Sequence, residues 1–389
     1  MIEHYIRGFE EELREIRHQI HENPELGLQE FKTSALVAEK LRQWGYEVEQ
    51  GLATTGVVAT LKVGDGEKSI GLRADMDALP IYENSGKPWA SKHPGLMHAC
   101  GHDGHTTILL GAARYFAETR RFNGTLRLIF QPAEEMINGG EIMVKEGLFD
   151  RFPCDVIFGM HNMPGLPVGK FFFQPGALMA SMDQFHITVR GCGGHGAIPH
   201  KAIDPVLVAA HITTALQSIV SRNVDPLEAA VITVGSIVAG EAANVIPDSA
   251  EMKISVRSLS RDTRQLLLTR IPALAQAQAA SFGATAEVTH VNGTPVLVND
   301  EEMARFAWQV ACKTFGEDRA EFGIKPLMAV KISLSCWKPN PKAVSCYSVM
   351  AMSGKVPAWC ITPVTTLTMQ AWSRQAATGA HWLKPGCNK

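Results

Sequence analysis

The amino-acid sequence predicts an α/β fold with a mixed, largely parallel sheet flanked by helices, into which a smaller α+β domain is inserted. Short apolar runs alternate with amphipathic helical patterns in the first half of the chain, which is typical of buried parallel strands. From about residue 182 onward, strands and helices follow one another in a different order. The chain has 389 residues, of which 46% are hydrophobic, so it is long enough for about two domains with cores of their own.

Three helices are expected in the first half of the chain. Residues 2–22 form the first, because apolar side chains recur there at spacings of three and four residues, at Ile6, Phe9, Leu13, Ile16 and Ile20. This segment is also charged, so we do not expect it to be a signal peptide. The other two helices are expected over residues 33–44 and 106–119.

Four short apolar segments of the first half are expected to be strands, namely residues 57–63, 69–76, 125–132 and 155–162. The last three each end in polar, ionisable residues. Ligands of parallel sheets bind at the carboxyl ends of the strands. We therefore expect a functional site where these three segments end.

Residues 182–292 are predicted to form the inserted domain. Strands are expected at residues 185–191, 229–240, 250–259 and 285–291, and helices at residues 205–220 and 264–282. This β-α-β-β-α-β order is typical of a ferredoxin-like unit. The main domain is then built from residues 1–181 and 293–389.

Charge and composition exclude several functions. Lys and Arg number 37 against 39 Asp and Glu, and a net charge of −2 offers no basic field for nucleic acid. No apolar run approaches the ~20 residues of a membrane span, so we expect no membrane association through one. Eight cysteines without paired spacing indicate reduced thiols and hence a cytoplasmic protein.

The last 63 residues differ in composition from the rest of the chain. Leu327–Lys389 contains six Lys and one Arg but no Asp or Glu, whereas the preceding residues carry all 39 acidic side chains. Four of the eight Cys and four of the seven Trp also lie in this tail. The tail is therefore either a separate module or a sequence that was not shaped by the same folding problem.

Residue types that bind metal ions are concentrated in four segments, RADMDALP (73–80), MHACGHDGHT (97–106), QPAEE (131–135) and GMHN (159–162). Cysteine, histidine and carboxylate together suit Zn, Mn, Co or Ni. The alternative for the second segment is a polar loop that caps the next helix, with Asp103 as the cap. Taken together, the four segments favour a metal site.

The adjacent carboxylates Glu134 and Glu135 follow a predicted buried strand. Neighbouring carboxylates repel each other, so at a strand end they require a cation or a raised pKa. One carboxylate on a metal ion and one left to take a proton from water would meet the needs of metal-assisted hydrolysis. The alternative for this pair alone is a solvated turn.

These motifs, in this order and followed by GGHGAIPH and ANVIPD, resemble the M20 metallopeptidase family. The resemblance is to its branch of hippurate hydrolases and N-acyl-amino-acid amidohydrolases, and it covers about residues 10–328. It implies a catalytic domain that holds two divalent ions, Zn or Mn with Co or Ni as alternatives. It assigns one general base, Glu134, and four metal ligands, Cys100, His102, Glu135 and His161.

The resemblance also implies roles for residues around the ligands and in the inserted domain. Asp75 and Asp77 lie in the segment that in related branches carries a ligand and its orienting carboxylate, and Asp77 is expected to support a ligand. His195 matches the residue that reaches toward the scissile carbonyl, where an imidazole stabilises the developing oxyanion. Asn244 and Arg257 match substrate-holding positions. The inserted domain is expected to act as a lid and to pair subunits into a homodimer or homotetramer.

The activity implied is hydrolysis of the amide bond of a small N-acyl or N-aroyl amino acid, which yields a carboxylate and a free amino acid. Two alternatives stay open: a catalytically impaired homologue that binds such a ligand or only dimerises, and a dipeptidase. The impaired alternative arises because a Ser-Glu-Asp-Phe segment and a final ligand histidine of the family are absent. The chain instead reads Val330-Lys331-Ile332-Ser333, and His381 is the one histidine of the tail.

A reading-frame shift near codon 330 would explain this departure. A codon string for Glu-Asp-Phe that is read one base later gives Lys-Ile and then a codon that begins with TC, which is compatible with Ser333. If the tail is genuine, the second metal site lacks one ligand and activity is reduced or lost.

Overall fold

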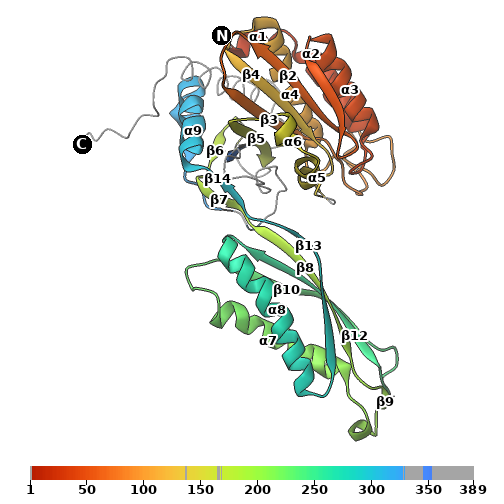
Figure 1. Cartoon of the computed structure of the whole chain (residues 1–389). Helices are drawn as coiled ribbons and strands as arrows, with labels where there is room; N and C mark the ends of the chain where they lie inside the picture. The colour runs from red at the N-terminus through yellow and green to blue at the C-terminus, as the bar shows by residue number, and fades with distance from the viewer. Residues whose placement is uncertain are drawn as a thin grey trace, which may run out of the picture. The chain divides into compact units, whose positions relative to one another are not determined.

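The computed structural model describes residues 2–135, 138–163, 167, 169–326, 328 and 345–352. Contacts divide these residues into two compact units (Figure 1). The first unit holds the chain up to Gly176 together with Val298–Lys325 and the strand at residues 345–352. The second unit is Ala177–Leu297, which contains the predicted inserted segment 182–292. The assignment of that segment as a lid and dimerisation domain stays a prediction.

The first unit is built on an eight-stranded mixed sheet (Figure 1). Its strands, in spatial order, are β1 (Glu47–Leu52), β2 (Gly56–Val63), β4 (Gly124–Gln131), β3 (Ser69–Asp75), β5 (Val156–Met163), β16 (Ser345–Met352), β6 (Phe171–Phe173) and β15 (Ala320–Phe322). The central neighbours β4, β3, β5 and β16 run parallel, as do β6 and β15. The pairs β1–β2, β2–β4 and β16–β6 are antiparallel. The predicted mixed α/β sheet is confirmed.

Helices cover both faces of this sheet. Successive side chains of a strand point to opposite faces, so neighbouring residues of one strand belong to two different cores. Val57 and Phe130 belong to a core shared with α1 (Ile2–Arg7), α2 (Glu10–Glu22), α3 (Phe31–Gln43), α4 (His102–Thr119) and α9 (Glu301–Phe315). Their neighbours Val58 and Ile129 belong to a second core, shared with α5 (Gly139–Lys145) and α6 (Leu148–Arg151). Burial on both faces explains why the strands read as continuous apolar runs.

Two helix boundaries differ from the prediction. The expected helix at residues 2–22 is two helices, because the chain turns at Gly8 and Phe9, whose N–H groups bond to carbonyls three residues back at 3.1 Å. Glycine disfavours a continuous helix there, and the turn still buries Phe9. The helix expected to begin at Thr106 begins at His102, so that His102 lies in its first turn.

The second unit has the predicted β-α-β-β-α-β order (Figure 1). Its elements are β8 (Ser181–Arg190), α7 (Pro205–Arg222), β10 (Ala230–Val238), β12 (Ser249–Ser258), α8 (Arg261–Ser281) and β13 (Thr285–Thr294). The sheet order is β10-β12-β8-β13, and all neighbours are antiparallel. Short elements complete the two units: β7 (Gly176–Met179) with β14 (Leu297–Asn299), β9 (Gly194–His195) with β11 (Val245–Ile246), and the 3-10 helices η1 (Pro199–Lys201) and η2 (Glu317–Arg319).

The composition predicts reduced thiols and no membrane span. Among the side chains that the structure describes, Cys100, Cys154, Cys192 and Cys312 are free thiols. None of the helices within the described ranges combines the length and apolar character that a bilayer crossing requires. The tail and its hypothetical frame shift lie outside the described residues, apart from the backbone of β16.

Candidate metal centre

The candidate site forms where β3, β4 and β5 end. These strands are parallel neighbours, so their carboxyl ends meet at one edge of the sheet. Asp77 follows β3, Glu134 and Glu135 follow β4, and His161 lies in the last part of β5. The first turn of α4 adds His102, and Gly101 before it has a φ of +89°, which favours glycine. Four segments, from Asp77 to His161 and thus spread over 84 residues of the chain, supply one site.

Potential ligand atoms lie within 4.8 Å of one another in three groups that share His102: one is Asp75, His102 and His105, and the other two contain the predicted ligands and base. In one group, the Sγ of Cys100 is 3.4 Å from the Nε2 of His161. In the other, the Nε2 of His102 is 3.7 Å from Oε1 of Glu135 and 3.8 Å from Oε2 of Glu134. The structure therefore brings together the four predicted ligands and the predicted base. Their roles stay predictions.

Asp77 orients the imidazole of His102. The Nδ1 of His102 lies 2.9 Å from the backbone oxygen of Asp77 and 3.1 Å from its Oδ1, which turns Nε2 toward the other ligand atoms. The second carboxylate oxygen of Asp77 accepts a hydrogen bond of 2.9 Å from the backbone N–H of Glu135. Burial alone would raise the pKa of Asp77, but the hydrogen bonds from His102 and Glu135 lower it. Asp77 thus stays ionised and holds two of the predicted ligands, His102 and Glu135, in position.

Asp75 belongs to a buried hydrogen-bond network, of which the sequence analysis named only Asp75 itself as a site residue. One of its carboxylate oxygens accepts from Arg73 at 2.7 Å, and the other lies 2.6 Å from the Nδ1 of His105. Arg73 donates twice to the side-chain oxygen of Gln131, at 2.7 and 2.9 Å. The residues missed were Arg73, Gln131 and His105. Only His105 carried a signal, because it follows His102 by one helical turn.

The turn that carries Glu134 and Glu135 is held by Glu30. Ala133 has a φ of +49°, which a non-glycine residue adopts only when its surroundings enforce it. Glu30 is buried and accepts from the N–H of Ala133 at 2.8 Å and from the hydroxyl of Thr55 at 2.5 Å. Burial raises the pKa of Glu30 to about 7 despite these hydrogen bonds. Sequence reasoning missed Glu30, which lies about 100 residues before the turn.

Asp103 does not cap α4, which corrects one alternative from the sequence. Its carboxylate is buried and bonds to α2 instead: the Nε of Arg17 donates to Oδ2 at 3.0 Å, and the Nδ1 of His21 lies at the same distance from that oxygen. Burial alone would raise the pKa of Asp103, but the hydrogen bond with His21 and the charge of Arg17 hold that pKa well below its usual range. Asp103 therefore fixes the first turn of α4, and with it the segment that carries Cys100 and His102, to α2.

The donor set of this site fits a divalent metal ion. A thiol, two imidazoles and a carboxylate are the ligands that zinc and other first-row ions prefer. In addition, Oε1 of Glu135 is buried and has no hydrogen-bond partner among the described residues. A buried carboxylate oxygen without a partner is unfavourable unless a cation binds it.

The other predicted site residues lie in the second unit. His195 is exposed on β9 opposite Val245 of β11, and its Nδ1 accepts from the N–H of Ala197 at 3.1 Å. The backbone oxygen of Asn244 accepts from the N–H of Gly196 at 2.8 Å, so His195 and Asn244 lie in adjacent segments. Arg257 is half-buried on β12, opposite Met182, and burial lowers its pKa. The structure thus brings His195 and Asn244 close together and places Arg257 on a different strand.

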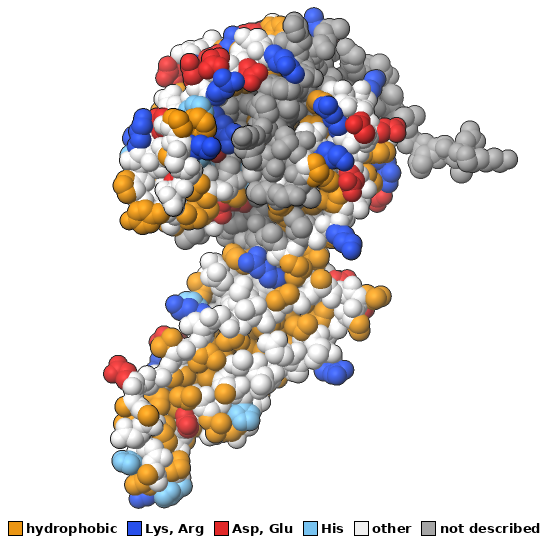
Figure 2. All heavy atoms as spheres, turned by 180° about the vertical axis from the view of Figure 1, so that it is seen from behind, with side chains coloured by type: hydrophobic (Ala, Val, Ile, Leu, Met, Phe, Trp, Pro, Cys, Tyr) orange, Lys and Arg blue, Asp and Glu red, His pale blue; other side chains and the backbone are white. Residues whose placement is uncertain are grey.

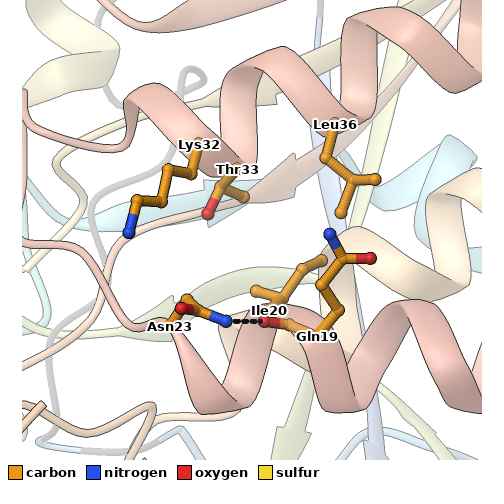
Figure 3. A pocket seen from close by; sticks show the side chains of 6 residues that line it. All are labelled: Gln19, Ile20, Asn23, Lys32, Thr33 and Leu36. Atoms are coloured by element: carbon orange, nitrogen blue, oxygen red, sulfur yellow. Dashed lines mark hydrogen bonds between the residues drawn. The ribbon is translucent and has the colours of Figure 1, made fainter. Parts of the chain in front are cut away.

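A pocket of about 230 Å³ lies between α2 and α3 (Figure 3). It is lined by Gln19, Ile20, Asn23, Lys32, Thr33 and Leu36. The side-chain amide of Asn23 donates to the backbone oxygen of Gln19 at 2.9 Å. The lining contains one ionisable side chain, that of Lys32, and none of the predicted site residues.

Comparisons with known proteins agree with this geometry. A family model described as peptidase family M20/M25/M40 matches residues 71–331. Hippurate hydrolase of Campylobacter jejuni is 50% identical over 82% of this chain and 83% of its own length. N-acetyl-L-cysteine deacetylase of Bacillus subtilis is 41% identical over 78% of this chain and 73% of its own length. The chain also resembles a crystal structure of the YXEP protein of Bacillus subtilis, which is called a dinuclear metal binding peptidase from the M20 family. The two structures superpose with a TM-score of 0.80 at 30% sequence identity, over 95% of this chain and 99% of that one.

Proposed function

The chain belongs to the peptidase family M20/M25/M40, and we propose that its metal centre hydrolyses the amide bond of N-acyl amino acids. The observation that carries this proposal is the convergence of a thiol, two imidazoles and two carboxylates at one sheet edge. In a metal-dependent hydrolase, a site of this kind supplies both substrate activation and proton transfer.

We assign the metal ligands and the base residue by residue. Cys100, His102, Glu135 and His161 would hold divalent ions, zinc or manganese in the first instance, with Asp77 supporting His102. Such ions supply Lewis-acid polarisation of the amide carbonyl and lower the pKa of water. This assignment rests on the short distances among these side chains and on the unpartnered oxygen of Glu135.

Glu134 is the proton carrier of the proposed reaction. Its carboxylate is buried and stands beside Glu135, with Oε2 at 3.8 Å from the Nε2 of His102. In this position it takes a proton from the attacking water and then gives it to the leaving amide nitrogen. The C–N bond breaks, and the products are a carboxylate and a free amino acid. General acid–base catalysis of this type contributes about 10²- to 10⁴-fold to the rate.

The substrate class is an N-acyl amino acid with either an aroyl or a short acyl group. The relatives named hippurate hydrolase and N-acetyl-L-cysteine deacetylase support both types. Hippurate and N-acetyl amino acids are therefore the first substrates to test.

The second unit supplies the remaining proposed roles. His195 would stabilise the oxyanion, and Asn244 and Arg257 would hold the substrate, Arg257 through its carboxylate. Hydrophobic side chains are exposed on this unit, among them Leu227, Val231, Ile237, Val238 and Val245 (Figure 2). Exposed apolar surface of this kind supports pairing of subunits through this unit into a homodimer or homotetramer. A cytoplasmic location belongs to the same proposal.

The proposal is tested by turnover after metal removal and reloading. The protein, treated with a chelator and then reloaded with Zn or Mn, should regain hydrolysis of hippurate or an N-acetyl amino acid. Glu134→Gln should bind the ions as the parent does and lose about 10²- to 10⁴-fold in kcat. Glu141→Gln is the control, because Glu141 is a carboxylate on α5 that pairs with Lys145 at 2.6 Å.

Three outcomes would contradict the proposal. A reloaded parent that binds the substrates without turnover is an impaired homologue. Turnover of free dipeptides alone indicates a dipeptidase. Equal activity of Glu134→Gln and parent removes Glu134 from the reaction.

A further inference from the structure

We propose that His105 is a positioning residue, which fixes His161 beside Cys100 and so sets the affinity of the metal centre. The inference rests on the proposed metal centre and adds a residue to it. His105 follows His102 by one turn of α4 and is buried. It is not among the four proposed ligands, and its ring lies next to two of them.

The ring nitrogens of His105 connect β3 to β5, the strand that carries the proposed ligand His161. On one side, Nδ1 lies 2.6 Å from Oδ1 of Asp75, at the end of β3. On the other side, Nε2 accepts a hydrogen bond of 3.1 Å from the backbone N–H of Asn162, in β5. Because the carboxylate of Asp75 accepts, Nδ1 of His105 carries a proton and donates it to Asp75. His105 therefore ties β3 to the residue that directly follows His161.

Asp75 is itself held in place, so the connection is rigid. Arg73 donates to the other oxygen of Asp75 at 2.7 Å and also binds Gln131, at the end of β4. Arg73, Asp75, His105 and Gln131 are all buried. Fully satisfied buried networks of this kind specify one arrangement of the segments that they join. Here they join the ends of β4, β3 and β5 with α4, which together carry three of the proposed ligands.

The position of Asn162 links the network to the ligand loop as well. The side-chain oxygen of Asn162 contacts His105, and a methyl group built on Gly101 would lie only 2.5 Å from that oxygen. Gly101 stands between Cys100 and His102, so Asn162 packs directly against the loop that carries both. The ring of His105 is 4.6 Å from that of His161 and 5.4 Å from that of His102, centre to centre. Loss of His105 would release His161 and this loop together.

Metal affinity measured by competition with a chromophoric chelator tests the role. His105→Ala should weaken binding of Zn²⁺ or Co²⁺ about 10- to 100-fold, the range for residues that orient metal ligands. The near-ultraviolet thiolate band of the Co²⁺ form should weaken or shift, and a Cys100→Ser variant identifies that band. His105→Gln should recover part of the affinity, because its amide oxygen can accept from the N–H of Asn162.

Tyr46→Phe is the matched control for a general loss of stability. The buried hydroxyl of Tyr46 donates to the backbone oxygen of Ala113 at 2.8 Å, so this variant removes one buried hydrogen bond to the same helix. It should keep the parent affinity and the Co²⁺ spectrum.

The outcomes separate this inference from the proposed function. If His105→Ala keeps the metal affinity and the Co²⁺ spectrum of the parent, the role of His105 is overturned. The same holds if Tyr46→Phe loses as much metal affinity as His105→Ala. A parent protein that binds no ion overturns the proposed metal centre itself. A folded His105→Ala variant with weak binding and partial recovery in His105→Gln supports the inference.

Discussion

The buried carboxyl group of Glu30 should make the stability of the protein fall as the pH rises from 5 to 8. Its pKa is about 7, against an ordinary value of 4.5, so the folded chain holds this proton more tightly than the unfolded chain. The stabilisation is fully present below pH 4.5 and is lost as the pH rises through 7. The difference between the two pKa values corresponds to about 3 kcal/mol of unfolding free energy.

Glu30→Gln should abolish this fall. Glutamine has the same shape and does not titrate, and its side-chain oxygen can still accept from the N–H of Ala133. Urea unfolding of parent and variant at pH 5 and pH 8 gives the difference directly. An excess of chelator is needed throughout, because metal binding also depends on pH. Relative to the parent, the variant should gain about 2–3 kcal/mol between the two pH values.

An equal fall in both proteins would refute this reasoning, because other groups would then cause the pH dependence. Thr55→Val supplies a second check. The hydroxyl of Thr55 lowers the pKa of Glu30. Its removal should therefore shift the fall of stability to higher pH.

Two further predictions concern the turn of Glu134 and the second unit. Gly27→Ala would place a methyl group 2.9 Å from Cα and Cβ of Ala133, so the free energy of unfolding should drop by about 1–3 kcal/mol and kcat should fall. Gly235→Ala is the control, because the nearest atom to its new methyl group lies at 3.9 Å. Equal stability and kcat in the two variants would contradict the steric argument. His195→Ala should lower kcat on hippurate by about 10²-fold or more if its imidazole stabilises the oxyanion. His186→Ala, which changes another exposed histidine of the same unit, should leave kcat unchanged. Unchanged steady-state kinetics in His195→Ala would exclude the oxyanion role.

The regular elements with long apolar patterns could be predicted from the sequence. Residues 57–63 and 125–132 read as strands because both faces of each strand are buried, and β2 and β4 match them within one residue. The helix break at Gly8 was missed because apolar spacing continues across it. Short strands such as β6 and β15 carry too few residues for a pattern.

The site was predictable where chemistry was concentrated in short motifs. Cys100 and His102 lie in one motif, and Glu134 and Glu135 in another, so the motifs taken together favoured a metal site. The supporting residues Glu30 and Arg17 could not be found in this way. Arg17 lies 86 residues before Asp103 and Glu30 lies 103 residues before Ala133, and their partners are set by how α2 and α3 pack on the sheet.

The attachment of Asp103 to α2 has a consequence for building chimeras with related enzymes. The loop before α4 and the first turn of this helix take their position from the bonds of Asp103 to Arg17 and His21, which lie more than 80 residues before Asp103 in the chain. A crossover between these two segments would pair a ligand loop with a foreign helix. Recombination should therefore exchange α2 and this loop as one block, with breakpoints before the first or after the second.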